Sequence, residues 1–176
     1  MFKFEIKLKT IVQVALLVAM EVVLNRFASI NTESLKIGFS FLPIALCGLL
    51  FGPIWASIAG GLADFLGAIL FPIGPYHVGF TIVAAVMGAV YGLFLYKRET
   101  PRFFPNIFCP AIINTLVLGL FVNTLWVSQL YSSQTYWGFF MFRMTTQYIF
   151  LIPVYLLLLP LLPRLASAIR KAGLAE

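Results

Sequence analysis

The sequence predicts an all-α integral membrane protein, a bundle of six transmembrane helices with both termini in the cytoplasm. Hydrophobic residues make up 61% of the 176-residue chain, charged residues make up only 10%, and the mean hydropathy is +0.99. A soluble domain is nearer half apolar and a quarter charged. Six apolar runs are separated by short polar segments, so we expect a single membrane domain spanning 1–176.

The first three predicted helices span 10–26, 37–51 and 53–70. Between the first two, the segment 27–36 carries Asn31, Thr32, Glu33 and Ser34 and is too polar to lie in lipid. The third run begins at Pro53, and proline suits the first turn of a helix.

The last three predicted helices span 78–96, 105–127 and 138–162. A rigid turn, Pro72-Ile73-Gly74-Pro75-Tyr76-His77, precedes the fourth and holds the only histidine. Pro153 and Pro160 are expected to kink the sixth, because proline cannot donate its backbone hydrogen bond.

The positions of the basic residues predict the orientation of the bundle. Cytoplasmic loops carry an excess of lysine and arginine. One side of the predicted bundle collects nine of them: Lys3, Lys7, Lys9, Lys97, Arg98, Arg102, Arg164, Arg170 and Lys171. The other side has only Lys36 in its loops and Arg26 at a helix end, so both termini are expected in the cytoplasm.

The third predicted helix carries one carboxylate, Asp64, on a face of small residues. Ala56, Gly60 and Gly67 share that face, because they follow the spacing of helical turns. Small residues let a neighbouring helix approach closely inside a membrane. Asp64 is therefore expected to point into the bundle, where an ionisable group indicates a functional site.

Three ionisable side chains are predicted at a common depth in the membrane. Glu21, Asp64 and Arg143 each lie five or six residues from the outer end of a predicted helix, roughly 7–9 Å below the surface. Arg26 and His77 would lie above them at the mouth. Such groups normally face the interior of a bundle and pair with one another.

Further polar residues extend this predicted site. Gln147 lies on the same helical face as Arg143, and Asn123 and Trp126 lie near the outer end of the fifth helix. Two readings remain open at this point. Arg143 could bond Glu21 or Asp64 and simply lock the helices, or the group could bind a ligand with a flat, donor-rich head and an acidic tail, since arginines take carboxylates in bidentate fashion.

The sequence lacks the motifs of several other classes of protein. It contains no GxxxxGK[ST] loop for nucleotide phosphates, no HExxH or Cys/His set for a metal, and no GxSxG nucleophile motif. The net charge of +6 is spread over helix ends rather than gathered in a basic patch for nucleic acid. We therefore expect no catalytic residue, cofactor or metal, and another protein must supply the energy if a solute moves.

Ala15 and Ala19, in the first predicted helix, form a small-xxx-small pattern that permits close crossing of another helix. The partner could be another protein, although packing within the same bundle is an equally open reading of such a pair.

The chain resembles the substrate-binding S components of energy-coupling factor (ECF) vitamin transporters, of the folate-specific type. The resemblance spans essentially the whole chain. It is carried by the residues Ala15-Leu-Leu-Val-Ala19, Asn25-Arg26, Ser40-Phe-Leu-Pro43, FGPIWASIAGGLADFLGAILFPIGPYHVGFT (51–81), Gly88-Ala-Val-Tyr-Gly92 and Phe142-Arg143.

The resemblance implies a non-catalytic subunit of a bacterial plasma-membrane importer that captures folate from outside. It also implies docking through Ala15 and Ala19 onto a transmembrane coupling subunit, which is shared with two cytosolic ATPases. Mapped onto this sequence, Arg26 and Arg143 would hold the glutamate tail and Asp64 the pterin edge, with His77 and Trp126 closing the site.

Arg26 lies on the same helical stripe as Ala15 and Ala19, at i, i+4 and i+11. One stripe cannot face both a partner and a ligand, so we expect the first helix to unwind or bend before Arg26. Three alternatives remain open: an S component for pantothenate or thiamine, an intramembrane enzyme using Asp64 and His77, and a structural scaffold.

Overall fold

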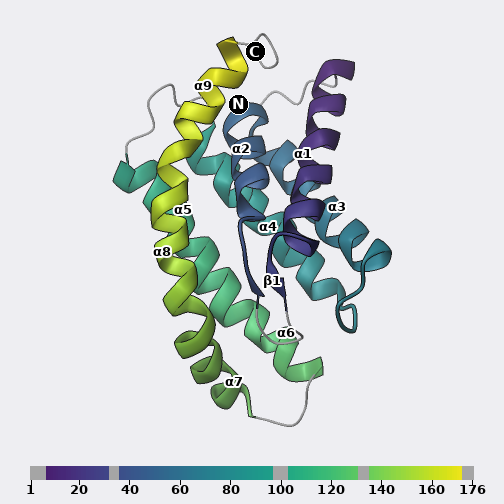
Figure 1. The fold of residues 1–176 in the computed structure, drawn as a ribbon, viewed down its shortest axis with the longest axis vertical. Helices are drawn as coiled ribbons and strands as arrows, with labels where there is room; N and C mark the ends of the chain where they lie inside the picture. The colour runs from purple at the N-terminus through teal and green to yellow at the C-terminus, as the bar shows by residue number, and fades with distance from the viewer. Residues whose placement is uncertain (1–6, 32–35, 97–102, 131–134, 172–176) are drawn as a thin grey trace.

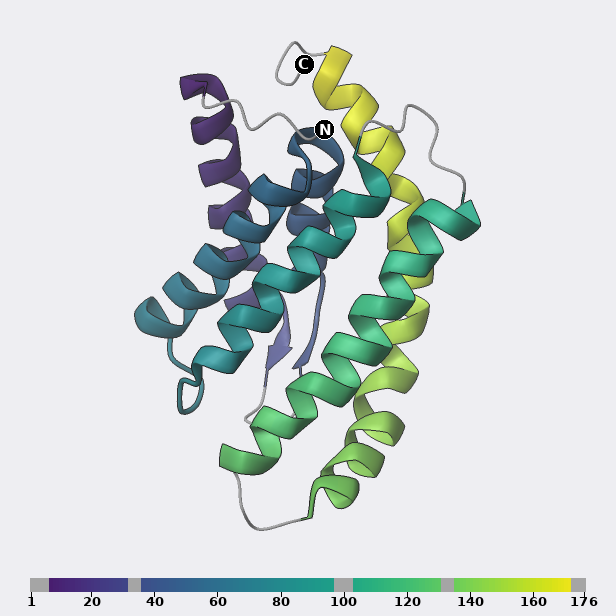
Figure 2. The same ribbon diagram turned by 180° about the vertical axis from the view of Figure 1, so that it is seen from behind.

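The computed structural model describes residues 7–31, 36–96, 103–130 and 135–171, and these residues are helical almost throughout (Figure 1). The first helix begins and the last helix ends at the same end of the molecule, here called the terminal end. The opposite end, where α6 ends and α7 begins, is called the loop end (Figures 1 and 2).

The elements follow one another with short connections. In chain order they are α1 (Leu8–Arg26), β1 (Ile30–Asn31), β2 (Lys36–Ile37), α2 (Phe41–Phe51), α3 (Pro53–Leu70), α4 (Val78–Leu95), α5 (Cys109–Ile112), α6 (Asn123–Leu130), α7 (Tyr136–Arg143), α8 (Ile149–Leu158) and α9 (Leu162–Lys171).

The later helices form two continuous helical segments, here called the two rods, 103–130 and 136–171. Within each rod, π-helical or 3-10 turns connect the α-helices. Three segments are π-helical, Phe103–Phe108, Ile113–Val122 and Met144–Tyr148, and Leu159–Leu161 forms a 3-10 turn. The chain is therefore helical without a break from Phe103 to Leu130 and from Tyr136 to Lys171. The two rods lie side by side and antiparallel (Figure 2).

Four of the described helices are long and apolar enough to cross a membrane: Leu8–Arg26, Pro53–Leu70, Val78–Leu95 and Asn106–Leu130. The chain is thus an all-helical protein with several membrane-capable helices, apart from one short strand pair. The helix Phe41–Phe51 has 11 residues, which corresponds to about 16 Å at the rise of an α-helix.

The prediction for the start of the second helix is wrong. It placed the helix at 37–51, whereas α2 begins at Phe41, because β2 pairs antiparallel with β1 in the register Ile30 to Ile37. Gly38 follows the pair and touches Ser29 so closely that a Cβ there would lie 1.8 Å from the hydroxyl oxygen. The chain therefore needs glycine where it leaves the strand.

Helices α3 and α4 form the most extensive helix pair in the bundle, and glycines bring them together. A Cβ at Gly88 would lie 2.0 Å from the Ala56 carbonyl oxygen, and one at Gly60 would lie 2.4 Å from the Ala84 carbonyl oxygen. Small residues let the backbones of two helices pack closely against each other, which stabilises helix association in lipid. Ala56 and Gly60 of the predicted small-residue face thus contact α4, whereas Gly67 of the same face lies against Arg26 of α1.

Candidate ligand-binding site

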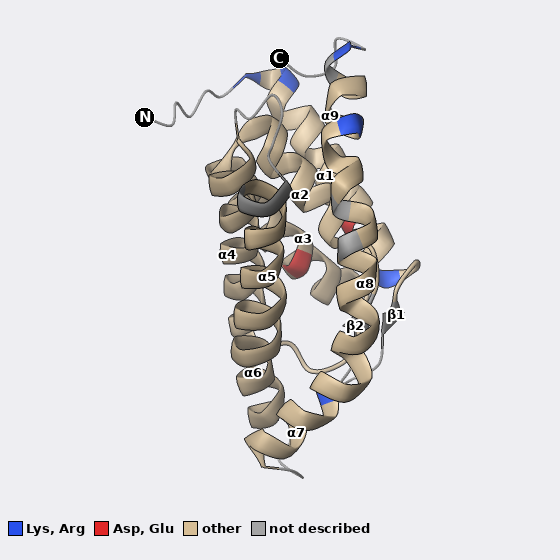
Figure 3. Cartoon of the chain, turned by 90° about the vertical axis from the view of Figure 1, so that its left-hand side faces the viewer, with Lys and Arg blue, Asp and Glu red and all other residues tan. Residues whose placement is uncertain are grey.

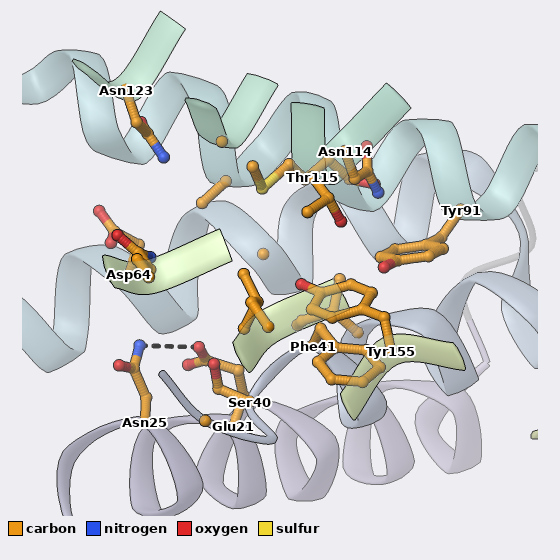
Figure 4. A pocket seen from close by; sticks show the side chains of 18 of the residues that line it. Glu21, Asn25, Ser40, Phe41, Asp64, Tyr91, Asn114, Thr115, Asn123 and Tyr155 are labelled. Carbon is orange, nitrogen blue, oxygen red and sulfur yellow. Dashed lines mark hydrogen bonds between the residues drawn. The ribbon is translucent and has the colours of Figure 1, made fainter. Parts of the chain in front are cut away.

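A cavity lies inside the bundle between α1, α2, α3, α4 and the two C-terminal rods. Counting all the empty space inside it and at its open mouth, its volume is about 870 Å³. Polar side chains line it from α1, α3, α4 and both rods, and Figure 4 labels ten of the lining residues. Hydrocarbon offers no hydrogen bonds to polar side chains, so a polar cavity inside a membrane bundle indicates a functional site.

Arg143 ends α7, and its guanidinium is buried with 5% of the residue exposed. Its Nε donates to Gln147 Oε1 at 3.1 Å, and its Nη1 donates to Thr124 Oγ1 at 2.8 Å. Both partners are neutral, and no carboxylate pairs with Arg143 in the described part of the chain. Burying a charge without a counter-ion is energetically costly. Arg143 therefore presents a positive charge to the cavity that an anionic group of a ligand would neutralise.

Asp64, on α3, lines the same cavity and is half-buried. Its Oδ2 accepts a hydrogen bond from Thr81 Oγ1 on α4 at 2.8 Å, and the same Thr81 oxygen lies 2.9 Å from the Tyr76 hydroxyl. This chain of polar atoms joins α3, α4 and the turn between them. It holds Oδ2 of the carboxylate against its neighbours on α4 and in the turn.

Glu21 and Asn25, on α1, also line the cavity. Both are buried, and Asn25 Nδ2 donates to Glu21 Oε1 at 2.9 Å (Figure 4). The sequence predicts Glu21 at the depth of Asp64, and the structure brings both carboxylates to the lining of one cavity.

Two of the other predicted site residues also line the cavity. Gln147 is held by Arg143, and Asn123 contributes a buried Oδ1 that has no hydrogen-bond partner in the described chain. Their suggested roles toward a ligand stay predictions, as does that of Asp64.

Three predicted site residues, Arg26, His77 and Trp126, are not among the side chains that line this cavity. The rings of His77 and Trp126 stack with centroids 4.9 Å apart and planes inclined by 26°. His77 Nδ1 also accepts a hydrogen bond from the Gly79 amide at 3.0 Å and so caps the start of α4. The stack ties the α3–α4 turn to α6 at one edge of the bundle.

Arg26 ends α1, and α1 continues without a break from Leu8 to Arg26. The prediction that this helix unwinds before Arg26 is therefore wrong. Its side chain is half-buried and reaches across to α3, where a Cβ at Gly67 would lie 3.0 Å from its Nε. The long aliphatic stem of arginine allows this reach, and the absence of a side chain at Gly67 leaves room for it.

Ala15 and Ala19 are exposed on the outside of α1, while Val14, Leu17 and Val18 are buried. The face that carries the small-xxx-small pattern is thus unoccupied by the described part of this chain. Its role in docking stays a prediction.

Sequence reasoning missed a second polar group at the far end of the cavity. It comprises Tyr91 on α4, Asn114 and Thr115 in the Ile113–Val122 segment, and Tyr155 on α8, with Phe41 of α2 beside them (Figure 4). The signal was present, since Asn114 and Thr115 interrupt an otherwise apolar run. Uncharged residues in a membrane helix are common, however, and only their convergence from three elements marks them out.

The sequence profile of a family described as "ECF-type riboflavin transporter, S component" matches residues 5–167. The chain belongs to this family of ECF transporter S components. It is also similar to "Folate transporter FolT" of Clostridium novyi (strain NT), with 36% identity over 121 residues, which covers 69% of each chain. A second protein of that name, from Streptococcus mutans serotype c, is 26% identical over 134 residues, 74% of this chain and 72% of the relative.

Among solved structures, this S component is similar to a crystal structure of FolT bound with folic acid. The TM-score is 0.80 at 32% sequence identity, and the match covers 90% of this chain and 94% of the other. The shared arrangement therefore extends over most of the chain.

Proposed function

We propose that this S component binds folate in the cavity and presents it for uptake by an ECF transporter. The observation that carries the proposal is the buried Arg143 guanidinium, which lines the cavity and, within the described parts of the chain, donates only to neutral acceptors. A glutamate tail would supply the missing anion through charge-assisted hydrogen bonds. The similarity to folate transporters and to a folic acid complex supports the same ligand.

Riboflavin is the second candidate, because the family description names it. Its isoalloxazine ring is also flat, but it carries no carboxylate. Riboflavin would leave Arg143 buried without a counter-ion, and burying an unpaired charge is unfavourable. The site chemistry therefore favours folate over riboflavin, and it disfavours the cationic thiamine for the same reason.

The residues of the site have distinct proposed roles. Arg143, with Gln147 and Asn123 beside it, takes a carboxylate of the tail, and Arg26 attracts the tail toward the mouth. The stacked pair of His77 and Trp126 helps to close the site at the edge of the bundle. Asp64 is one candidate for the pterin edge, since a carboxylate accepts hydrogen bonds from amino and ring N–H groups.

The topology and the partners are proposals of the same kind. Six spans with both termini in the cytoplasm agree with the basic residues, most of which lie at the terminal end in the described chain (Figure 3). In that arrangement the exposed Ala15 and Ala19 face docks onto a transmembrane coupling subunit. Two cytosolic ATPases attached to that subunit supply the energy, in a bacterial plasma membrane.

Calorimetric titration of detergent-purified protein tests the proposal. Folic acid should bind with measurable heat, while riboflavin, thiamine and pantothenate at the same concentrations should not. The Arg143→Ala and Arg26→Ala variants should bind folic acid more weakly. Absence of heat with folic acid, or tighter binding of riboflavin, would overturn the assignment. Recovery of the ligand chemically unchanged separates a binding subunit from an intramembrane enzyme.

A further inference from the structure

The last helix, α9, is packed onto the bundle by one face and carries basic residues on the other. Leu162 and Ala166 are buried in the hydrophobic core, and Ile169 packs against it. Through this face α9 contacts α2. The helix is therefore held by the core, and the fold sets the direction in which its outer face points.

The outer face of α9 continues an exposed stripe that begins on α8. Leu157 is 72% exposed and Leu161 is 40% exposed. Beyond them, three further residues of the stripe are exposed on α9: Arg164, Ala168 and Lys171. The five residues follow one another at spacings of four, three, four and three, so they lie on one side of the rod 136–171. The apolar side chains come first, and the basic ones follow toward the terminal end, where Figure 3 shows Lys and Arg on α9.

The change from exposed leucine to exposed arginine and lysine indicates the depth at which a spanning helix leaves the hydrocarbon. Leucine is favourable beside acyl chains, whereas a charged side chain there is costly. At the rise of an α-helix, Arg164 lies about 5 Å beyond Leu161, and Lys171 lies about 10 Å beyond Arg164. The two basic side chains can therefore reach the lipid headgroups while the leucines contact the acyl chains.

The two basic side chains of this stripe lack an acidic partner in the described parts of the chain. The described residues include two acidic side chains, Glu21 and Asp64, and both line the cavity. The charges of Arg164 and Lys171 are thus open to an anion outside the chain. A phospholipid matches both halves of the stripe, because it joins a phosphate to acyl chains. An acidic protein surface would match the basic half alone.

We propose that Leu157, Leu161, Arg164 and Lys171 form a binding site for an anionic phospholipid in the leaflet around the terminal end. Arg164 and Lys171 bind the phosphate through charge-assisted hydrogen bonds, and one acyl chain lies along the leucines. The bound lipid fixes the depth of the rod 136–171 in the membrane. This inference rests on the proposed six-span topology, in which that rod crosses the membrane, and not on the identity of the transported ligand.

Thermal unfolding of the full chain in a nonionic detergent tests the site with three additives. They are phosphatidylglycerol, phosphatidylcholine with the same acyl chains, and inorganic phosphate. Phosphatidylglycerol should raise the unfolding temperature of the wild type more than phosphatidylcholine does, because a ligand of the folded state stabilises it. Inorganic phosphate, which has no acyl chain, should not raise it.

Native mass spectrometry of the same samples measures the relative affinity for phosphatidylglycerol. Arg164→Gln and Lys171→Gln should each lower that affinity about fivefold, the loss expected for one basic residue at an anionic lipid surface. The double variant should lose about 30-fold and show no preference between the two lipids.

Two controls separate a site on α9 from a general effect of positive charge. Lys36→Gln removes the same charge from β2, which lies away from the terminal end (Figure 1), and should keep the preference for phosphatidylglycerol. Arg164→Lys keeps the charge and should retain most of the affinity. Arg164 and Lys171 do not line the cavity, so their variants should bind folic acid as the wild type does. A cooperative unfolding transition without lipid shows that each variant is folded.

The outcomes separate this inference from the proposed function. Equal stabilisation by the two lipids would show that lipid of any charge covers the stripe, and would overturn the inference. An undiminished preference for phosphatidylglycerol in the double variant would place the anionic lipid elsewhere and would also overturn it. Equal stabilisation by inorganic phosphate would identify a site for a free anion instead. Wild-type protein that fails to bind folic acid refutes the proposed function, and the lipid result is still read from the unfolding temperatures.

Discussion

Replacing Arg143 by glutamine should have opposite effects on ligand binding and on the stability of the ligand-free protein. Arg143 is 5% exposed, and its guanidinium donates only to the neutral Gln147 and Thr124 among the residues that the structure describes. A residue held mainly for a ligand carries an uncompensated desolvation cost until the ligand arrives. Arg143→Gln removes that cost together with the ligand contact.

The expected magnitudes follow from the same contacts. A hydrogen bond to a charged group contributes about 1.5–3 kcal/mol, so folic acid should bind roughly 10- to 150-fold more weakly to the glutamine variant. Arg143→Lys keeps the charge but loses the planar fork, so its affinity should lie between those of the glutamine variant and the wild type. Without ligand, the glutamine variant should unfold at the same temperature as the wild type or higher.

The assay is calorimetric titration with folic acid beside thermal unfolding in the same detergent. Arg164→Gln is the matched control, because Arg164 is exposed on α9 and its loss removes the same charge far from the cavity. A ligand-free glutamine variant less stable by about 3 kcal/mol, the cost of breaking a buried structural pair, would refute the reasoning. Arg143 would then be a structural residue whose hydrogen bonds hold the two rods together.

Two further predictions concern helix packing and docking. Gly88→Ala should lower stability in detergent by about 1–3 kcal/mol, because its Cβ would meet the Ala56 carbonyl oxygen. Gly61→Ala is the control, since the nearest neighbour of its Cβ would lie at 3.4 Å, and it should be neutral or stabilising. Equal stability of the two variants would contradict the packing argument. Ala15→Trp or Ala19→Trp should leave folic acid binding by the purified protein intact but abolish folate uptake in cells, and retained uptake would exclude docking through this face.

Helix packing in this bundle could be predicted from the sequence because its signal is local and periodic. The spacing of Ala56, Gly60 and Gly67 predicts a small-residue face, and all three are buried in the structure. Hydropathy likewise predicts the long apolar runs, since every residue of a span must satisfy the same lipid solvent. The strand pair Ile30–Asn31 with Lys36–Ile37 escaped prediction because two-residue strands leave no periodic pattern.

Within the candidate site, the charged residues could be predicted from the sequence and most of the uncharged residues could not. Charges inside apolar runs are rare enough to be informative individually, so Asp64, Arg143 and Glu21 could be selected from the sequence. The second polar group, Tyr91, Asn114, Thr115 and Tyr155, could not be selected in this way, because tyrosine, asparagine and threonine are ordinary in membrane helices. Tyr91 and Tyr155 are also 64 residues apart in the sequence. Only the folded bundle shows that their side chains line one cavity.

The first helix carries two different functional faces in the proposal, and it runs from Leu8 to Arg26 without unwinding. The sequence predicts a conflict because Ala15, Ala19 and Arg26 share a stripe. In the structure the cavity is served by a different stripe, which carries Glu21 and Asn25 and is rotated by about 200° from Ala19. The alanine face is therefore left outside, and Arg26 turns aside over Gly67. Under the proposed function, the continuous helix would present one face to the ligand and the opposite face to the partner, so a substitution on the alanine face should affect docking without touching the cavity.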